Sequence, residues 1–220
     1  MYQQRQTGFT ARRTHMVDKQ LIARGIRDAR LLAAIGLIPR EEFLHSENRP
    51  RSYRDEPVPI GCGQTLSQPY MTALMVECLG LRGDENVLEV GAGCGYHAAL
   101  LGCMAASVVS IELVPELAEL ARENLRRTGY SRNVTIVCGD GSAGWPERAA
   151  FDAISVAAGA PAVPQALLDQ LADGGRLVIP VGQRKDQHLL LIERQGGQYL
   201  TRTITGCRFV PLLGAHGWSE

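Results

Sequence analysis

From residue 86 to residue 181, short apolar runs alternate with segments of helical spacing, and this rhythm restricts the possible fold most strongly. Runs of β-branched and apolar residues predict strands, and the leucine- and alanine-rich segments between them predict helices. Strands joined by helices run parallel, with right-handed crossovers and helices on both faces of the sheet. The predicted strands are 86–90, 108–111, 134–138, 151–157 and 176–181, and the predicted helices are 98–104, 115–128 and 164–171.

Two more extended runs follow the alternating part, at 187–194 and 198–205. Gly196-Gly197 lies between them and is typical of a hairpin turn. We therefore expect the sheet to end in antiparallel strands.

The part of the chain ahead of residue 86 has a different character. Residues 1–13 are polar and basic without periodicity, and we expect a loose tail. Residues 14–45 have apolar positions at helical spacing, interrupted by glycines and a proline, which predicts two or three short helices. Residues 46–63 are rich in Pro, Arg and Gly and predict a loop, whereas 68–81 predict a helix with Pro69 in its first turn.

Composition excludes several classes of protein. Lys+Arg and Asp+Glu both number 23, so there is no basic excess for a nucleic-acid partner. No apolar stretch approaches the ~18 residues of a membrane span, and the N-terminus lacks the pattern of a secretory signal. The six cysteines form neither a Cys-x-x-Cys motif nor a zinc-ligand spacing. We expect a cytoplasmic protein with no metal site and reduced thiols, three or four of them buried.

The first predicted strand runs into the sequence Glu-Val-Gly-Ala-Gly-Cys-Gly at 89–95. Ligands of doubly wound sheets bind at the carboxyl ends of the strands, where glycines let the backbone turn tightly and approach the ligand. A dinucleotide fingerprint requires Gly-x-Gly-x-x-Gly, and Tyr96 occupies the place of its third glycine. The spacing therefore disfavours a pyrophosphate ligand and an NAD-dependent oxidoreductase.

Three acidic residues follow three successive predicted strands. Glu89 would repel a pyrophosphate but attract a cationic amino acid head group. Glu112 comes ~20 residues after the glycine turn, where an acidic residue accepts hydrogen bonds from ribose hydroxyls. Asp140, in Gly-Asp-Gly, is placed to receive an adenine amino group. Together they suit an adenosine ligand with a positive tail, and the alternative for each is a solvated strand end or a helix cap.

At this point the sequence resembles the class I S-adenosylmethionine-dependent methyltransferases, and more specifically the protein-L-isoaspartate O-methyltransferase family. The resemblance covers roughly residues 14–214. The glycine motif alone indicates only a methyltransferase, whereas Gly-Gln-Thr-Leu-Ser-Gln-Pro at 63–69 is the specific signal. Further matching segments are 16–21, 38–43, 57–61, 139–141, 144–146 and 209–212. Cys94 and His97 depart from the family, which often has Thr or Ser and Gln there.

The resemblance implies a doubly wound, Rossmann-like methyltransferase sheet, mostly parallel, with antiparallel strands near the C-terminus and added N-terminal helices. It implies one domain over 14–220: a helical and substrate-loop region at 14–82, a cofactor-binding core at 83–195 and C-terminal strands at 196–220. The implied cofactor is S-adenosyl-L-methionine, with S-adenosyl-L-homocysteine as product. Candidate cofactor residues are Glu89, Gly91, Gly93, Gly95, Glu112, Leu113, Asp140 and Gly141.

By resemblance, Ser67 is the active-site serine, and the implied substrates are isoaspartyl-containing proteins and peptides. Candidate substrate-binding residues are Thr65, Ser67, Pro69, Tyr70, Val210 and Leu212. A carboxylate acceptor has a pKa near ~4 and is already ionised, so no general base is required. Ser67 would then orient the acceptor, although a helix N-cap explains the same serine.

Two alternatives to general repair remain open at the level of sequence. A member of the same family could modify a carboxylate in one specific peptide, or the chain could be a non-catalytic cofactor-binding module. His97 is a weaker candidate for lining the pocket. We expect a monomer.

Overall fold

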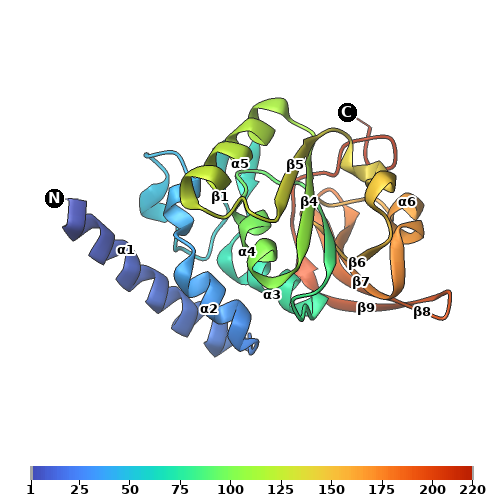
Figure 1. Cartoon of the computed structure of the whole chain (residues 1–220), viewed down its shortest axis with the longest axis horizontal. Helices are drawn as coiled ribbons and strands as arrows, with labels where there is room; N and C mark the ends of the chain where they lie inside the picture. The colour runs from blue at the N-terminus through green and yellow to red at the C-terminus, as the bar shows by residue number, and fades with distance from the viewer. Residues whose placement is uncertain (1, 220) are drawn as a thin grey trace.

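A seven-stranded sheet forms the centre of the protein (Figure 1). The computed structural model describes residues 2–219, with side chains from residue 8 onward. The strand order is β5-β4-β3-β6-β7-β8-β9; the first five run parallel, and β8 and β9 are antiparallel to their neighbours. The strands are β3 (Asn86–Val90), β4 (Ser107–Glu112), β5 (Val134–Cys138), β6 (Phe151–Val156), β7 (Leu171–Gln183), β8 (Asp186–Gln195) and β9 (Gln198–Cys207).

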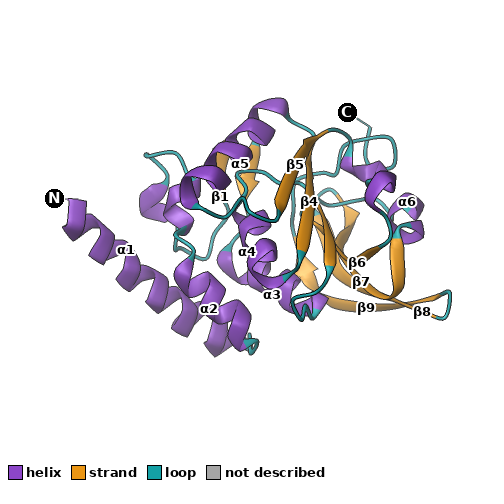
Figure 2. Cartoon of the chain, in the orientation of Figure 1, coloured by secondary structure: helices purple, strands orange, loops and turns teal. Residues whose placement is uncertain are grey.

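Helices cover both faces of the parallel part (Figure 2). One face carries α3 (Pro69–Leu79), α4 (Tyr96–Met104) and α5 (Pro115–Thr128), and the other carries the short α6 (Gln165–Asp169). Side chains alternate across a strand, so β3 sends Val87 into the core cluster under α3–α5 and Leu88 into the cluster on the α6 side. The predicted α/β sheet with antiparallel C-terminal strands is confirmed.

The predicted helix at 115–128 is confirmed, and its boundaries have a local cause. Pro115 occupies the first turn, where a missing N–H is harmless, and Gly129 follows the helix with a φ of 82°. The same signals bound α3, which begins at Pro69 and is followed by Gly80 with a φ of 62°.

The N-terminal segment differs from its predicted loose tail. It forms a helix, α1 (Tyr2–Met16), which continues through a π-helical turn (Val17–Leu21) and a 3₁₀ turn (Ile22–Arg24). Phe9 packs against the core cluster, and Arg12 and Arg13 donate to the Pro50 carbonyl and the Tyr53 hydroxyl. These distant contacts stabilise a helix whose sequence has no apolar periodicity.

Short elements connect α1 to α3. The helix α2 (Ala29–Leu37) is capped by the Asp28 carboxylate, and two 3₁₀ turns follow, η3 (Arg40–Phe43) and η4 (Arg49–Arg51). The loop predicted for 46–63 contains a strand, β1 (Val58–Gly61), which pairs with β2 (Gln64–Leu66) as an antiparallel hairpin. This hairpin leads directly into α3.

β9 is an edge strand of the sheet. Its pairing with β8 shifts register between Leu189 and Leu190, where Ile204 is the extra residue on β9. The middle of β9 is exposed, and Arg202 forms an ion pair with Glu193 of β8 at 3.2 Å.

The cysteines are free thiols, but the expected burial of three or four was wrong. Only Cys94 is buried, whereas Cys78 and Cys207 are half-buried and the other three are exposed. No helix within residues 2–219 is both long and apolar enough to cross a membrane.

The order of the strands places a crevice at the glycine turn. The chain passes from β3 outward through β4 to β5, then returns to the other side of β3 with β6 and β7. Ligands of open parallel sheets bind at this reversal, beyond the carboxyl ends of the strands.

Candidate active site

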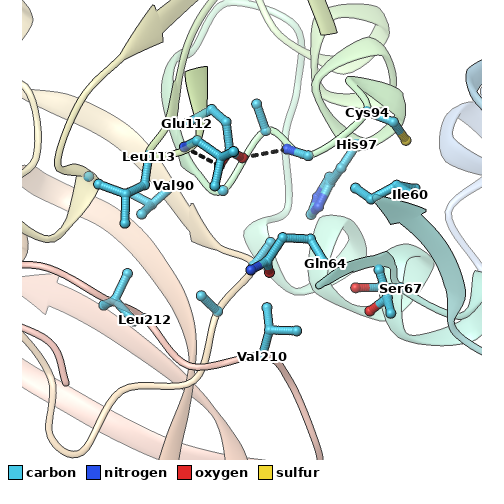
Figure 3. Close-up of a pocket in the computed structure, with 18 of the residues that line it drawn as sticks. Ile60, Gln64, Ser67, Val90, Cys94, His97, Glu112, Leu113, Val210 and Leu212 are labelled. Atoms are coloured by element: carbon cyan, nitrogen blue, oxygen red, sulfur yellow. Dashed lines mark hydrogen bonds between the residues drawn. The ribbon is translucent and has the colours of Figure 1, made fainter. Parts of the chain in front are cut away.

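A cavity lies at the reversal point, between the glycine turn, the β1–β2 hairpin and the C-terminal segment around residue 210 (Figure 3). Val90 and Glu112, at the ends of β3 and β4, line one side of this glycine-loop cavity. The other lining residues are Ile60, Gln64, Thr65, Leu66, Ser67, Thr72, Gly91, Ala92, Gly93, Cys94, His97, Ile111, Leu113, Val114, Gly141, Ala157, Ala158, Val210, Pro211, Leu212 and Leu213.

The glycines of the turn have two different roles. Gly91 and Gly93 line the cavity with φ values of 95° and 54°, a conformation that residues with a side chain rarely adopt. A Cβ on Gly93 would lie 3.1 Å from Cδ1 of Ile60 and narrow the cavity. Gly95 does not line it; a Cβ there would meet the backbone of Ala121 on α5 at 3.1 Å. Gly95 therefore permits helix packing, which is not the cofactor role predicted for it.

Glu112 is fixed at the cavity by its own neighbours. Its carboxylate accepts hydrogen bonds from the backbone N–H of Gly93 at 2.8 Å and of Val114 at 3.0 Å (Figure 3). The residue is 6% exposed, so the carboxylate is presented to a sheltered space. Leu113 also lines the cavity and is 41% exposed, which leaves an apolar surface beside the acid.

Glu89 lies one layer behind the cavity wall. It is fully buried, accepts a hydrogen bond from the Ser110 hydroxyl, and its Oε1 is 3.7 Å from Nδ1 of His97, which does line the cavity. Burial raises the pKa of Glu89 to about 8 and lowers the pKa of His97 to about 4. Both groups are therefore uncharged at neutral pH, and the predicted attraction of a cation requires Glu89 to release its proton.

Asp140 follows β5 as predicted, but its carboxylate is engaged within the protein. Its carboxylate accepts hydrogen bonds from the N–H and hydroxyl of Ser142 and from the N–H of Ala215, and it does not line the cavity. Burial alone would raise the pKa of Asp140, but these hydrogen bonds outweigh it and lower the pKa. The adjacent Gly141 lines the cavity, where a Cβ would lie 2.5 Å from Cγ1 of Val90. Asp140 thus fastens the C-terminal segment, and a contact with an adenine amino group stays a prediction.

Ser67 and Thr65 lie where the glycine-loop cavity meets a second one, which we call the adjacent cavity. Both residues line both cavities, as do Ala157 and Val210. The other residues of the adjacent cavity are Pro57, Gln68, Met71, Gly206, Cys207, Arg208 and Phe209. Two molecules, one bound in each cavity, would therefore contact each other beside Ser67.

Ser67 is not a helix cap. The N-cap of α3 is Gln68, which uses no side-chain hydrogen bond. Among the residues whose side chains are described, 8–219, none bonds to the Ser67 hydroxyl. The Ser67 carbonyl accepts a hydrogen bond from Nη2 of Arg40 at 2.6 Å. The backbone of this serine is therefore held while its hydroxyl stays available.

Of the other candidate substrate residues, two line a cavity and two do not. Val210 lines both cavities and Leu212 only the glycine-loop cavity. Pro69 is buried in the first turn of α3, and Tyr70 lies beneath the guanidinium of Arg24, whose Cζ is 3.5 Å from the ring centroid. Pro69 and Tyr70 line neither cavity, so the structure does not bring them to the site.

The backbone of the segment 209–212 is held by hydrogen bonds to two other segments. Gln187 bonds to both the N–H and the carbonyl of Phe209, and Gly159 bonds to the Val210 carbonyl and the Leu212 N–H. These four backbone groups are already paired, so they are not available to an extended peptide.

Sequence reasoning missed several lining residues. Gln64 belongs to the 63–69 motif but received no role, although its side chain points into the cavity (Figure 3). Ala157 follows β6, and its place after a strand end was a usable signal. Ile60 and Thr72 could not have been found, because only the folded hairpin and α3 bring them to the glycine turn.

The residues present fit S-adenosylmethionine. Gly91 and Gly93 leave space for a ligand against the backbone, Glu112 offers a carboxylate suited to ribose hydroxyls, and Nε2 of His97 is buried without a hydrogen-bond partner in the described chain. The fold and this site define an S-adenosylmethionine-dependent methyltransferase with a Rossmann-like sheet.

Comparison with known proteins identifies the family. The family model described as Protein-L-isoaspartate(D-aspartate) O-methyltransferase (PCMT) matches residues 11–217. Protein-L-isoaspartate O-methyltransferase 2 of Marinobacter nauticus is 55% identical over 208 residues, covering 94% of each chain. The chain belongs to the protein-L-isoaspartate(D-aspartate) O-methyltransferase family.

Solved structures agree with this membership. A protein-L-isoaspartate O-methyltransferase superposes with a TM-score of 0.82 at 33% identity, covering 93% of this chain and 67% of the other. A Plasmodium falciparum structure assigned to the same enzymes has a TM-score of 0.78 at 26% identity and covers 91% of this chain and 98% of its own. That structure is a complex with S-adenosyl-L-homocysteine.

Proposed function

We propose that the protein transfers a methyl group from S-adenosylmethionine to the free carboxylate of L-isoaspartyl residues in damaged proteins and peptides. Methylation turns one carboxylate oxygen into a methoxy group, which can leave far more readily than the oxygen of the free carboxylate. The next backbone nitrogen can then attack the ester carbonyl, lose its proton and expel methanol, which closes a succinimide; hydrolysis of the ring gives back partly normal aspartate. The reaction would thus begin a repair that completes without the enzyme.

The observation that carries this proposal is the position of Ser67 between the two cavities. The glycine-loop cavity suits the cofactor, and the adjacent cavity is the remaining approach to the same serine. A substrate carboxylate that enters beside Met71 and Phe209 would reach Ser67 from the side opposite the glycine turn.

When bound, S-adenosylmethionine supplies an electrophilic methyl group with a neutral leaving group. Gly91, Gly93 and Glu112 would hold it, and Leu113 would contribute an apolar contact. These residues bind and orient; no proton has to be removed, because the acceptor carboxylate is ionised at neutral pH.

Ser67 orients the acceptor in this proposal. Its hydroxyl is free of other described partners and can donate to one carboxylate oxygen while the second oxygen faces the glycine-loop cavity. Alignment of the nucleophile lowers the activation barrier by removing unproductive orientations. Ser67 is half-buried, so its surroundings reduce the access of competing water.

The test uses paired peptides that differ only in one isoaspartyl or aspartyl residue, together with methyl-labelled cofactor. We expect label in the isoaspartyl peptide alone, released with time as the ester closes to succinimide. Equal labelling of both peptides, or of neither, would overturn the proposed substrate.

The role of Ser67 has its own control. Ser67→Ala is expected to lower kcat by tenfold or more, in line with the loss of a charged hydrogen bond of about 1.5–3 kcal/mol, while the Kd of S-adenosylhomocysteine stays within twofold. Ser107→Ala is the matched variant, since Ser107 bonds to Asn86 at the far end of β3 and β4. It should leave both quantities unchanged.

We further propose that the enzyme acts as a monomer in the cytoplasm without a nucleic-acid or membrane partner. The balance of 23 basic and 23 acidic residues supports the absence of a nucleic-acid partner, and the free thiols support the cytoplasmic location.

A further inference from the structure

We propose that Arg40 is a positioning residue, which holds the peptide group of Ser67 in place and thereby sets the direction of the serine hydroxyl. This inference rests on the proposed role of Ser67. Arg40 is the first residue of η3, 27 positions before Ser67 in the chain, and it lines neither cavity.

Two hydrogen bonds define the position of Arg40. Its Nη2 donates to the Ser67 carbonyl at 2.6 Å, and its Nε donates to the Ser52 carbonyl at 2.7 Å. The planar guanidinium thus bridges two loop segments that are otherwise separated by β1 and β2. Because the fork is rigid, it fixes the orientation of both carbonyls and not only their distance.

The guanidinium is also anchored to the glycine turn. Its Cζ lies 4.9 Å from the ring centroid of Tyr96, which is the first residue of α4 and directly follows Gly95. Tyr96 is buried, so its ring is a fixed platform for the cation. Arg40 therefore connects the wall that carries Ser67 to the wall that carries the glycine turn.

The energetics argue against a purely structural reason for this arginine. Arg40 is 0% exposed, and burial lowers the pKa of its guanidinium, although the aromatic neighbours and Cys94 oppose that shift. Within residues 2–219 it has no carboxylate partner, because the neighbouring Glu41 accepts the Tyr53 hydroxyl, and its Nη1 is unpaired. A well-packed apolar side chain would satisfy such a core at least as well.

The location of the contact explains its effect on the serine. Ser67 lies between β2 and Gln68, the N-cap of α3, and Pro69 restricts the backbone on the far side of Gln68. The Arg40 bond restrains the near side. Without it the Ser67 peptide could rotate, and a displacement of about 1 Å at a reacting group lowers a rate by up to about 100-fold.

The experiment is a double-mutant cycle between Arg40→Met and Ser67→Ala, measured on the full-length protein with the isoaspartyl peptide. We expect Arg40→Met alone to lower kcat by tenfold or more while the Kd of S-adenosylhomocysteine changes less than threefold. In the Ser67→Ala background the same substitution should lower kcat by less than twofold, because the hydroxyl it positions is absent.

Arg194→Met is the matched control. Arg194 is a half-buried arginine that, like Arg40, donates to a carbonyl and lies near a tyrosine ring. Its Nη1 donates to the Leu171 carbonyl at 2.5 Å, and its Cζ is 5.9 Å from the ring centroid of Tyr199. It lines neither cavity, so its loss should lower thermal stability without changing kcat below the unfolding temperature.

If Arg40→Met does not fold, Arg40→Lys completes the same cycle, since lysine keeps the charge but cannot hold both carbonyls with one planar fork. Equal losses of kcat in the wild-type and Ser67→Ala backgrounds would overturn the proposal, as would a large loss of S-adenosylhomocysteine binding. If Ser67→Ala itself leaves kcat unchanged, the proposed role of Ser67 fails and the role of Arg40 fails with it. If Ser67→Ala slows the reaction and the cycle is additive, only the role of Arg40 fails.

Discussion

Replacing Glu89 by glutamine should remove a pH dependence of folding stability that one buried carboxyl group creates. Burial raises the pKa of Glu89 to about 8 in the folded protein, against 4.5 for an ordinary glutamate. Between these values the folded protein holds one proton more than the unfolded chain. Stability is therefore lost as the pH rises from 4.5 to 8.

His97 has the opposite effect in a lower window. Burial lowers the pKa of His97 to about 4, against 6.5 for an ordinary histidine, so its contribution to stability is lost as the pH falls from 6.5 to 4. The two contributions cancel between about 4.5 and 6.5. Between pH 6.5 and 8 only Glu89 acts, and at about 1.4 kcal/mol per pH unit the loss over this window is about 2 kcal/mol.

The assay is urea unfolding of the ligand-free protein at several pH values between 6.5 and 8. Wild type should lose about 2 kcal/mol of unfolding free energy, or ~4–8 °C in Tm, across this range. Glu89→Gln resembles the neutral acid, so it should match wild type near pH 6.5 and stay nearly flat to pH 8. Parallel curves for the two proteins would refute the argument that Glu89 is protonated in the folded state.

Three further predictions concern the cavity and its closure. Gly93→Ala combines a φ of 54° with a Cβ at 3.1 Å from Cδ1 of Ile60. The left-handed strain should lower the free energy of unfolding by ~1–2 kcal/mol, and the added methyl group, which narrows the cavity, should raise the Kd of S-adenosylhomocysteine in calorimetry. Glu112→Gln sets an amide N–H₂ against one of the two backbone donors that the carboxylate accepts from. A loss of about 2 kcal/mol of binding free energy predicts a roughly 30-fold higher Kd of S-adenosylhomocysteine. An unchanged Kd would contradict a ribose contact. Gly214→Ala places a Cβ against the Asp140 carboxylate, so it should disturb the hydrogen bond from the Ala215 N–H to Asp140 and lower the Tm. A Tm equal to that of wild type would show that this hydrogen bond does not stabilise the fold.

Much of the fold could be predicted because its signals are local. The strands 86–90 and 134–138 are runs of apolar and β-branched residues, and the structure confirms their bounds. The hairpin between β8 and β9 turns at Gly196 and Gly197, both with positive φ, as their sequence indicated. In each case a few consecutive residues carry the information.

The predictions that were wrong concern features that depend on contacts between residues far apart in the sequence. Helix α1 has no periodic apolar face, and Phe9, Arg12 and Arg13 contact segments that only folding brings near. The ionisation of Glu89 is likewise a property of burial, which a sequence motif does not encode. Asp140 follows a strand as predicted, but a C-terminal residue 75 positions away takes one of its carboxylate oxygens.

The site was predictable in outline because its main residues follow strands that the sequence indicates locally. Gly91, Gly93 and Glu112 line the cavity because strand ends of a parallel sheet converge whatever the rest of the chain does. Pro69 and Tyr70 are neighbours of Ser67 in the sequence, yet the first turn of α3 directs them away from it. Adjacency along a chain is a poor guide where a loop becomes a helix.

The bulged edge strand β9 bears on how such a protein survives among its proposed substrates. Damaged chains expose extended segments, and a long, flat, unpaired edge would recruit them into the sheet and trap the enzyme. The register shift at Ile204 interrupts the regular repeat of donors and acceptors, and Arg202 places a charge on the exposed stretch. The molecule can therefore encounter partly unfolded proteins repeatedly while its own sheet resists growing by another strand.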